Sequence, residues 1–185
     1  MSSNYLDICN QALLFIGATK IQSFTDGSLE GEICEQFYQG TVDELLTRQY
    51  WKFATKYKQL AQLNKSGVNG FSKAYALPTD FLSVQGIEGY NVEYEIAEGV
   101  LYTNADSVKL KYTYAVDVNS WNPAFKLLAA YQLASIIANP VTSNTTKAEF
   151  YTAMAQKQMT VAVSMDSRQD TNEYRKTYRF LGVRY

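Results

Sequence analysis

The chain has 185 residues, of which 46% are hydrophobic and 19% are charged, so we expect one folded domain with a real hydrophobic core. Its formal net charge of -1 argues against nucleic-acid binding by release of counterions from a basic surface. The absence of histidine excludes Ser-His and Cys-His nucleophiles, and two cysteines alone are too few for an ordinary zinc site. We therefore expect no metal and no cofactor.

The sequence opens with two amphipathic helices. The first is predicted over residues 3–17, because its apolar residues recur at three- and four-residue steps. Gly17 offers the left-handed position that ends such a helix. A second helix with a similar apolar stripe is predicted over residues 28–50. Two such helices joined by a short loop are expected to pack as an antiparallel pair.

Each of these helices carries one cysteine on its apolar stripe. Cys9 and Cys34 could face each other across the helix pair. We expect them to be reduced thiols in the core, because free cysteine is among the most buried residue types.

The apolar pattern changes from helical to alternating after Trp51. It predicts an antiparallel sheet of roughly four to six strands over residues 52–118. The clearest strand runs from Val108 to Tyr114, where apolar and polar residues alternate. A hairpin is predicted around Ala97-Glu98-Gly99, where the short turn needs a positive φ.

Two further helices follow the sheet. Asn122-Pro123 is a favourable helix start, and the nearly uncharged apolar run behind it predicts a central helix over residues 122–139, with Pro140 just past its end. A fourth helix is predicted over residues 145–167. Its apolar stripe is expected to face the core and consists of Phe150, Met154, Val161 and Met165.

Together these elements predict an α+β fold. It is a four-helix bundle core with an antiparallel β-sheet inserted between helices 2 and 3 and an extended C-terminal tail. Residues 1–167 form a single domain, and residues 168–185 form the tail. No apolar run reads as long enough to span a bilayer, and the first residues lack the basic start and apolar core of a signal peptide.

The tail interleaves cations with aromatic residues and shows no continuous helical or strand stripe. Residues of these types favour buried contacts with a partner, so we expect the tail to be a partner-binding segment. The alternative is a tail that folds back on its own domain or is disordered. The predicted partner-binding residues are Arg168, Tyr174, Arg175, Lys176, Tyr178, Arg179, Phe180, Arg184 and Tyr185.

Several short runs, taken in order and spacing, resemble the head–tail adaptor proteins of tailed bacteriophages. In short-tailed phages this family is called tail tubular protein A, or the head–tail connector. The resemblance covers roughly residues 4 to 165 and does not extend to a residue-level match in the tail. The runs are Leu6 to Leu13, Ile16-Gly17, Ile21 to Phe24, Glu44 to Leu46, Trp51 to Ala54 and Tyr75 to Leu82.

The resemblance implies a structural virion protein and not an enzyme. Members of the family form a dodecameric ring that joins the portal protein to the tail nozzle protein and continues the DNA channel. DNA passes through such a ring without sequence-specific binding. The resemblance further implies assembly in the host cytoplasm, a place in the neck or tail of the virion, and no membrane contact. The tail of the chain is then expected to become ordered against the portal or an adjacent subunit.

Two other functions stay open at this point. A tail-associated peptidoglycan hydrolase needs only two carboxylates, and the candidate pairs are Glu30 with Glu32 or Glu35, and Glu93 with Glu95. We expect these acids to be ordinary surface charges. A small helical scaffold that forms dimers is the other alternative. The basic and aromatic tail could also stack on single-stranded nucleic acid, but its own acids reduce its positive charge.

Overall fold

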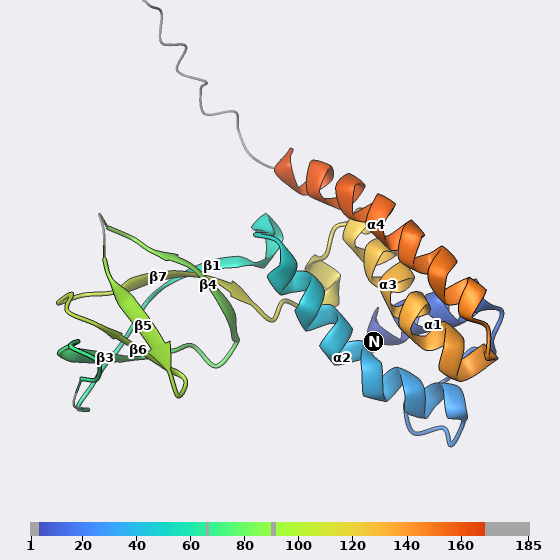
Figure 1. Cartoon of the computed structure of the whole chain (residues 1–185), viewed down its shortest axis with the longest axis horizontal. Coiled ribbons are helices and arrows are strands. Elements are labelled where there is room, and N and C mark those ends of the chain that lie inside the picture. The colour runs from blue at the N-terminus through green and yellow to red at the C-terminus, as the bar shows by residue number, and fades with distance from the viewer. Residues whose placement is uncertain (1–3, 66, 90–91, 169–185) are drawn as a thin grey trace, which may run out of the picture.

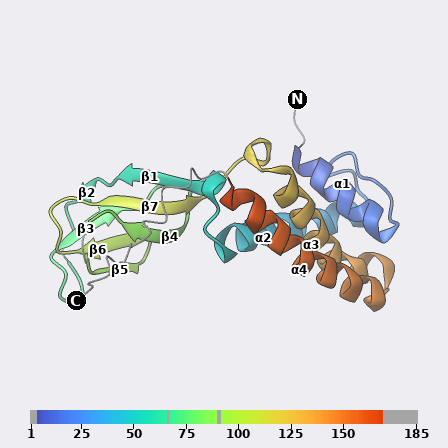
Figure 2. The same cartoon turned by 90° about the horizontal axis from the view of Figure 1, so that it is seen from above.

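The computed structural model describes residues 4–65, 67–89 and 92–168. Within these residues the chain forms four α-helices and two antiparallel sheets, so the fold is mixed α+β. Figures 1 and 2 show an elongated molecule with the helices at one end and the strands at the other. The strands lie in the chain between the second and third helices, so the sheets form an insertion, as predicted.

The first two helices, α1 (Asn4–Ile16) and α2 (Leu29–Arg48), begin and end within two residues of their predicted bounds. Gly17 ends α1 with a φ of 75°, a conformation that glycine adopts without strain. Ser28 caps α2, because its side-chain oxygen accepts the backbone N–H of Gly31 at 3.1 Å.

The two helices pack mainly on α3 and touch each other at few residues. The contacts between them include Tyr5 of α1 with Tyr38 of α2, whose ring centroids are 6.1 Å apart. Cys9 and Cys34 also lie together, buried and free, as expected for reduced core thiols. The expected antiparallel pair is therefore held together largely through a third helix.

That third helix, α3 (Pro123–Thr142), is central to the fold. Asn122 caps it by accepting the Phe125 N–H at 2.8 Å, and Pro123 occupies the first turn, as predicted. The helix continues three residues beyond its predicted end, so Pro140 lies inside it. Proline removes one backbone hydrogen bond, but the last turn closes through the N–H of Ser143, which donates to Asn139 O at 2.8 Å.

The fourth helix, α4 (Thr145–Ser167), has its predicted bounds but presents a different face to the core. Its buried residues are Ala155, Ala162 and Asp166. The small alanine side chains let α4 approach α3 closely, and α3 is itself rich in buried alanine. The predicted core stripe therefore points outward. Three of its members are exposed: Phe150 at 56%, Val161 at 48% and Met165 at 40%.

The insertion contains two sheets where the sequence predicted one. The first sheet has the order β1-β7-β4 and the second has the order β2-β3-β6-β5. The strands are β1 (Thr55–Gln59), β2 (Gln62–Leu63), β3 (Lys73–Ala76), β4 (Phe81–Ile87), β5 (Tyr94–Ala97), β6 (Val100–Thr103) and β7 (Lys109–Tyr114). The predicted hairpin is the β5–β6 pair, whose turn has positive φ at Glu98 and Gly99.

The two sheets share a small core of their own. Tyr75 of β3 and Leu101 of β6 pack with Leu110 and Tyr112 of β7, and Leu60, just after β1, belongs to the same cluster. Two sheets that bury apolar side chains against each other form a sandwich, whereas a single flat sheet would leave those side chains exposed to solvent. The short helix η1 (Lys52–Ala54) precedes β1, so the first strand begins three residues later than its predicted start.

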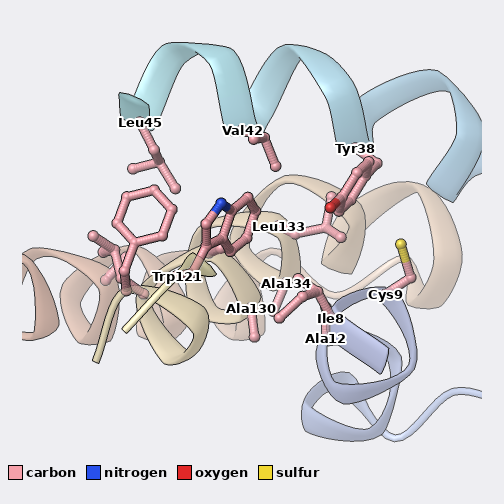
Figure 3. Close-up of a cluster of buried hydrophobic side chains, with 14 of the residues drawn as sticks. Ile8, Cys9, Ala12, Tyr38, Val42, Leu45, Trp121, Ala130, Leu133 and Ala134 are labelled. Carbon is pink, nitrogen blue, oxygen red and sulfur yellow. The ribbon is translucent and has the colours of Figure 1, made fainter. Parts of the chain in front are cut away.

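The main core lies among the four helices. Figure 3 shows Tyr38, Val42 and Leu45 of α2 pointing toward Trp121 and Leu133, with Ile8, Cys9 and Ala12 of α1 nearby. Another short helix, η2 (Val118–Ser120), leads the chain from β7 back to this core.

One helix of the described residues is long and apolar enough to cross a membrane by length and composition, namely α3. The expectation that no apolar run is long enough to span a bilayer was therefore wrong for this helix. Half of its apolar window is buried in the fold, where α1, α2 and α4 pack around it. Its place as the central helix accounts for its apolar character.

Candidate interaction surfaces

The predicted partner-binding tail lies almost wholly outside the described residues. Arg168 is described: it is exposed, and its backbone N–H donates to Asp166 O at the end of α4. The other predicted residues fall in the part of the chain that the structure leaves undescribed, and they are Tyr174, Arg175, Lys176, Tyr178, Arg179, Phe180, Arg184 and Tyr185. The surfaces on which such a segment could bind must therefore be sought on the described fold.

The end of α4 is fixed at the joint between the helices and the sheets. Asp166 is buried, and its Oδ2 accepts the backbone N–H of Lys52 at 2.8 Å. The Lys52 side chain donates to Ser167 O at 3.4 Å. Asp166 Oδ1 is buried and has no hydrogen-bond partner in the described part of the chain. Because Lys52 is where the chain leaves the helices, the tail begins beside the entrance to the sheets.

The larger apolar hollow is a groove between α1, α2 and the segment 115–121, which we call the α1–α2 groove. Its volume is about 490 Å³. Its aromatic wall includes Tyr5, Phe24 and Tyr38, whose ring centroids lie 5.1 to 6.3 Å apart. Trp121 completes the wall from the segment that returns from β7, and Figure 3 shows it facing Tyr38 and Val42.

The rim of this groove is acidic. Glu35, Asp43 and Asp117 line it, and among the residues that the structure describes no lysine or arginine lines it. Burial raises the pKa of Tyr38, and the negative charges of Asp117 and Asp43 raise it further. The groove is thus an aromatic surface in a negative field, which suits a cationic and aromatic ligand.

The rim acids have local roles that leave their charges available. Asp43 Oδ1 accepts a hydrogen bond from Gln39 Nε2 at 2.8 Å. Asp117 Oδ1 accepts the Asn119 N–H at 2.8 Å and so caps η2. Both donors are neutral amides, so these hydrogen bonds hold the two carboxylates in place without pairing them with a cation.

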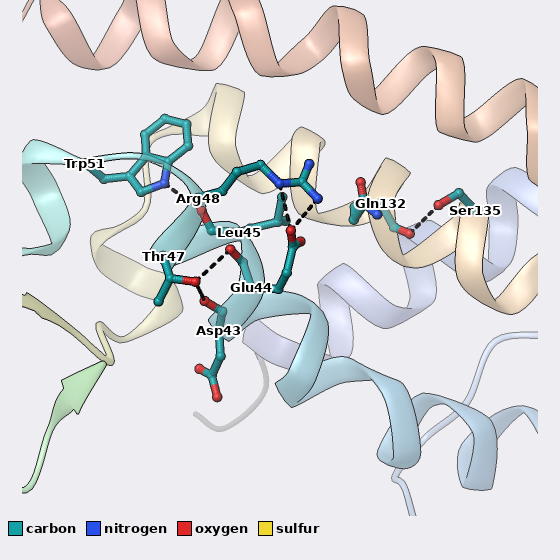
Figure 4. A network of polar contacts seen from close by, with 8 residues as sticks. All are labelled: Asp43, Glu44, Leu45, Thr47, Arg48, Trp51, Gln132 and Ser135. Carbon is teal, nitrogen blue, oxygen red and sulfur yellow. Dashed lines mark hydrogen bonds and ion pairs between the residues drawn. The ribbon is translucent and has the colours of Figure 1, made fainter. Parts of the chain in front are cut away.

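A second, smaller groove runs between α2 and α3 and measures about 320 Å³. Phe37 and Ile136 supply its apolar surface. Figure 4 shows the ion pair that lies at one end, in which Arg48 Nε donates to Glu44 Oε1 at 2.7 Å. This groove offers a charged ligand less than the first does, because Arg48 and Glu44 already pair with each other.

The outward stripe of α4 is the third surface, in which Phe150, Val161 and Met165 are exposed and Met154 is half-buried. It runs along one side of the helix, while the opposite side packs on α3. Phe150 has a ring neighbour, Tyr151, in an edge-to-face contact at 5.1 Å. A row of large apolar side chains facing water is a common sign of a protein–protein contact surface.

Of the carboxylates considered for glycosidase chemistry, Glu35 lines the α1–α2 groove. On the insertion, both carboxylate oxygens of Glu95 accept hydrogen bonds from Asn69 Nδ2, at 2.8 and 3.0 Å. In the part of the chain that the structure describes, no group of three or more His, Cys, Asp or Glu could hold a metal ion.

The two cysteines offer no reactive thiol at the surface. Both are buried, and they hydrogen-bond to each other. That hydrogen bond, together with burial, raises the pKa of the Cys9 thiol. Cys9 is therefore a poor nucleophile, because the thiolate is the reactive form. The same hydrogen bond lowers the pKa of the Cys34 thiol, but burial keeps that thiol away from the surface.

The α1–α2 groove and the outward stripe of α4 were both missed from the sequence. The groove is built from three segments that lie far apart in the chain, so no local pattern marks it. Its sequence signal is slight, because the loop after α1 and the segment 115–121 each contribute one aromatic residue, Phe24 and Trp121. The stripe was seen as a pattern but placed on the wrong side of its helix.

No protein-family model matches the chain, and no curated protein matches it either.

Proposed function

We propose that this chain is a structural virion protein of the head–tail adaptor type. In this proposal it forms a ring, dodecameric as in the family it resembles, between the portal protein and the tail nozzle protein. The ring continues the DNA channel, and DNA passes through it without sequence-specific contacts. The protein acts in the neck or tail of the virion and is not an enzyme.

The observation that carries this proposal is the outward apolar stripe of α4. Its exposed members, Phe150, Val161 and Met165, repeat along one side of the helix over about four turns. Exposed apolar side chains in such a row are costly in water and gain free energy when a second surface covers them. We further propose that the four helices act as one bundle in the wall of the ring, with the stripe at the border between subunits.

The charge balance supports the same role. The chain carries 17 cations and 18 acids. A strongly basic wall would hold DNA by contacts to its phosphates and would oppose sliding. A nearly neutral wall lets DNA pass, which is what a channel protein requires.

The direct test is the native mass of the purified chain with and without a portal ring, measured by light scattering or native mass spectrometry. We expect the chain to load onto the portal as a closed ring. A fixed dimer that ignores the portal contradicts the proposal and favours the dimeric scaffold; cell-wall cleavage would then be assayed.

A matched pair of variants tests the stripe itself. Val161→Lys places a charge in the stripe and should lower loading on the portal by about tenfold or more, because a buried unpaired charge opposes association. Gln156→Lys adds the same charge on the same helix, at an exposed position off the stripe, and should load as the wild type does. Equal loading by both variants would remove the stripe from the interface.

A further inference from the structure

One acid-free stretch of the sequence complements the α1–α2 groove. Residues 174–185 hold four cations, four aromatic residues and no acid. We propose that, in the free chain, residues 174–185 bind in the α1–α2 groove of the same chain. The contact goes beyond the proposed function, because it forms before any portal or second copy is present and withholds both the groove and the tail from them.

Charge is the first argument. The last eighteen residues hold five of the 17 cations and two of the 18 acids, so they carry +3 and the preceding 167 residues carry -4. Three of those acids, Glu35, Asp43 and Asp117, line the groove, whereas no described lysine or arginine does. Opposite charges at a rim speed the encounter of two surfaces and fix their register.

The aromatic lining is the second argument. Four rings line one hollow of about 490 Å³, and they belong to Tyr5, Phe24, Tyr38 and Trp121. Aromatic rings prefer offset or edge-to-face neighbours, and an arginine binds well over an aromatic face. A segment that interleaves Arg with Tyr and Phe supplies both kinds of partner.

The end of α4 lies beside the segment that borders the groove. Asp166 accepts the backbone N–H of Lys52 at 2.8 Å, which sets the end of α4 next to Trp51. The indole N–H of Trp51 donates to Leu45 O at 2.8 Å, as Figure 4 shows. The residue after Leu45 is Leu46, which lines the groove. The tail therefore starts near the groove of its own chain.

Ring contacts give the distance that the chain must cover. The centroids of Trp51 and Trp121 each lie 4.9 Å from that of Phe125, so the two indoles are within about 10 Å of each other. Trp121 belongs to the groove wall. Residues 168–173 extend to about 20 Å, which is enough to bring the basic stretch to the groove.

The short connection favours the same chain over a second copy. A short linker holds a segment near its site at an effective concentration in the millimolar range. In a micromolar solution of free chains, the groove of another copy is about a thousandfold more dilute than this. The same-chain contact is therefore a device of the unassembled protein.

The test is a photo-crosslink in the full, free chain. Tyr178→p-benzoylphenylalanine places the probe inside the basic stretch. Chains labelled with ¹⁴N and with ¹⁵N are mixed at micromolar concentration, irradiated and mapped by mass spectrometry. We expect same-label crosslinks alone, to residues 35–46 or 115–121, in a yield that does not change on dilution. Mixed-label crosslinks to the groove would mean that a second copy is the partner. Crosslinks only to other surfaces, or none, would mean that the groove is not the site. Each of these results overturns the proposal.

A charge swap tests whether the groove acids and the tail cations pair directly. Glu35→Lys with Asp43→Lys should lower the same-chain crosslink yield by about tenfold, and so should Arg175→Glu with Arg179→Glu. Combining the two pairs should restore at least half of the yield. Glu149→Lys, an exposed site on α4 outside the groove, is the control and should leave the yield unchanged. Failure of the combined variant to recover would contradict the pairing.

The same-chain contact and the adaptor role fail in different ways. A chain that loads on the portal but gives no crosslink to its groove when free refutes the contact and leaves the adaptor role standing. A chain that gives the same-chain crosslink but never loads on the portal keeps the contact and refutes the adaptor role.

Discussion

Phe125 is the residue whose substitution tests the packing of this fold most sharply. It is fully buried near the start of α3 and makes edge-to-face contacts with three other rings. The ring centroids of Trp51, Phe53 and Trp121 lie 4.9, 5.0 and 4.9 Å from its own. Two of these partners come from the start of the insertion, and Trp121 comes from its end.

The expected cost of Phe125→Leu follows from these contacts. Exchange of one large apolar side chain for another usually costs less than about 1.5 kcal/mol. Each well-placed aromatic pair contributes about 0.5–1.5 kcal/mol beyond the area it buries. Loss of three such pairs adds about 1.5–4.5 kcal/mol. We therefore expect Phe125→Leu to lower the free energy of unfolding by roughly 2–5 kcal/mol.

Urea denaturation followed by tryptophan fluorescence measures this loss. Trp51 and Trp121 are buried in the cluster, so their emission reports on it directly. Phe150→Leu is the control, because Phe150 is exposed and should cost less than about 1 kcal/mol. A loss below about 1 kcal/mol for Phe125→Leu would refute the reasoning. A double-mutant cycle with Phe53→Leu should give a coupling of about 0.5–1.5 kcal/mol.

Three further predictions concern polar groups. Asp166→Ala removes the acceptor of the Lys52 backbone N–H and should lower the free energy of unfolding, measured by urea denaturation, by about 1–3 kcal/mol. A variant as stable as the wild type would show that this hydrogen bond does not stabilise the fold. The hydrogen bond from Lys56 holds the pKa of Asp80 below its ordinary value of about 4. The stabilisation that ionised Asp80 gives the fold is therefore present above about pH 4 and is lost as the pH falls through the lowered pKa. In Asp80→Asn the free energy of unfolding, measured by urea denaturation, should fall less over this acid range than in the wild type. Burial, with the hydrogen bond to Asp80, raises the pKa of Tyr112 to about 12. The free energy of unfolding should therefore decline as the pH rises from about 10 through that value. Tyr112→Phe should lose less of its free energy of unfolding over this range.

The helices could be placed from the sequence because their signals are local. Apolar spacing, the helix start at Asn122-Pro123, and Gly17 each act within one or two turns. The face of α4 could not be read in this way. Counting large apolar residues favoured the stripe with Phe150, but close packing on α3 selects Ala155 and its neighbours, because small side chains let two helices approach.

The sheets show a similar limit. Strands such as β7 were visible from alternation, but their partners depend on residues far away in the chain. β1 pairs with β7 in a register that sets Thr55 opposite Thr113. β3 pairs with β6, with Lys73 opposite Thr103. The strands form two sheets because they divide between the two faces of a small core. No local sequence pattern predicts on which face a given strand lies.

The contacts around residues 51 and 52 tie the two ends of the molecule together. Trp51 packs on Phe125 of α3, and the next residue donates its backbone N–H to Asp166 of α4. The same short segment therefore holds the start of the insertion against two helices. Because α4 ends at Ser167, the sheets and the beginning of the tail share one support. Weakening this joint should therefore loosen both the start of the insertion and the end of α4.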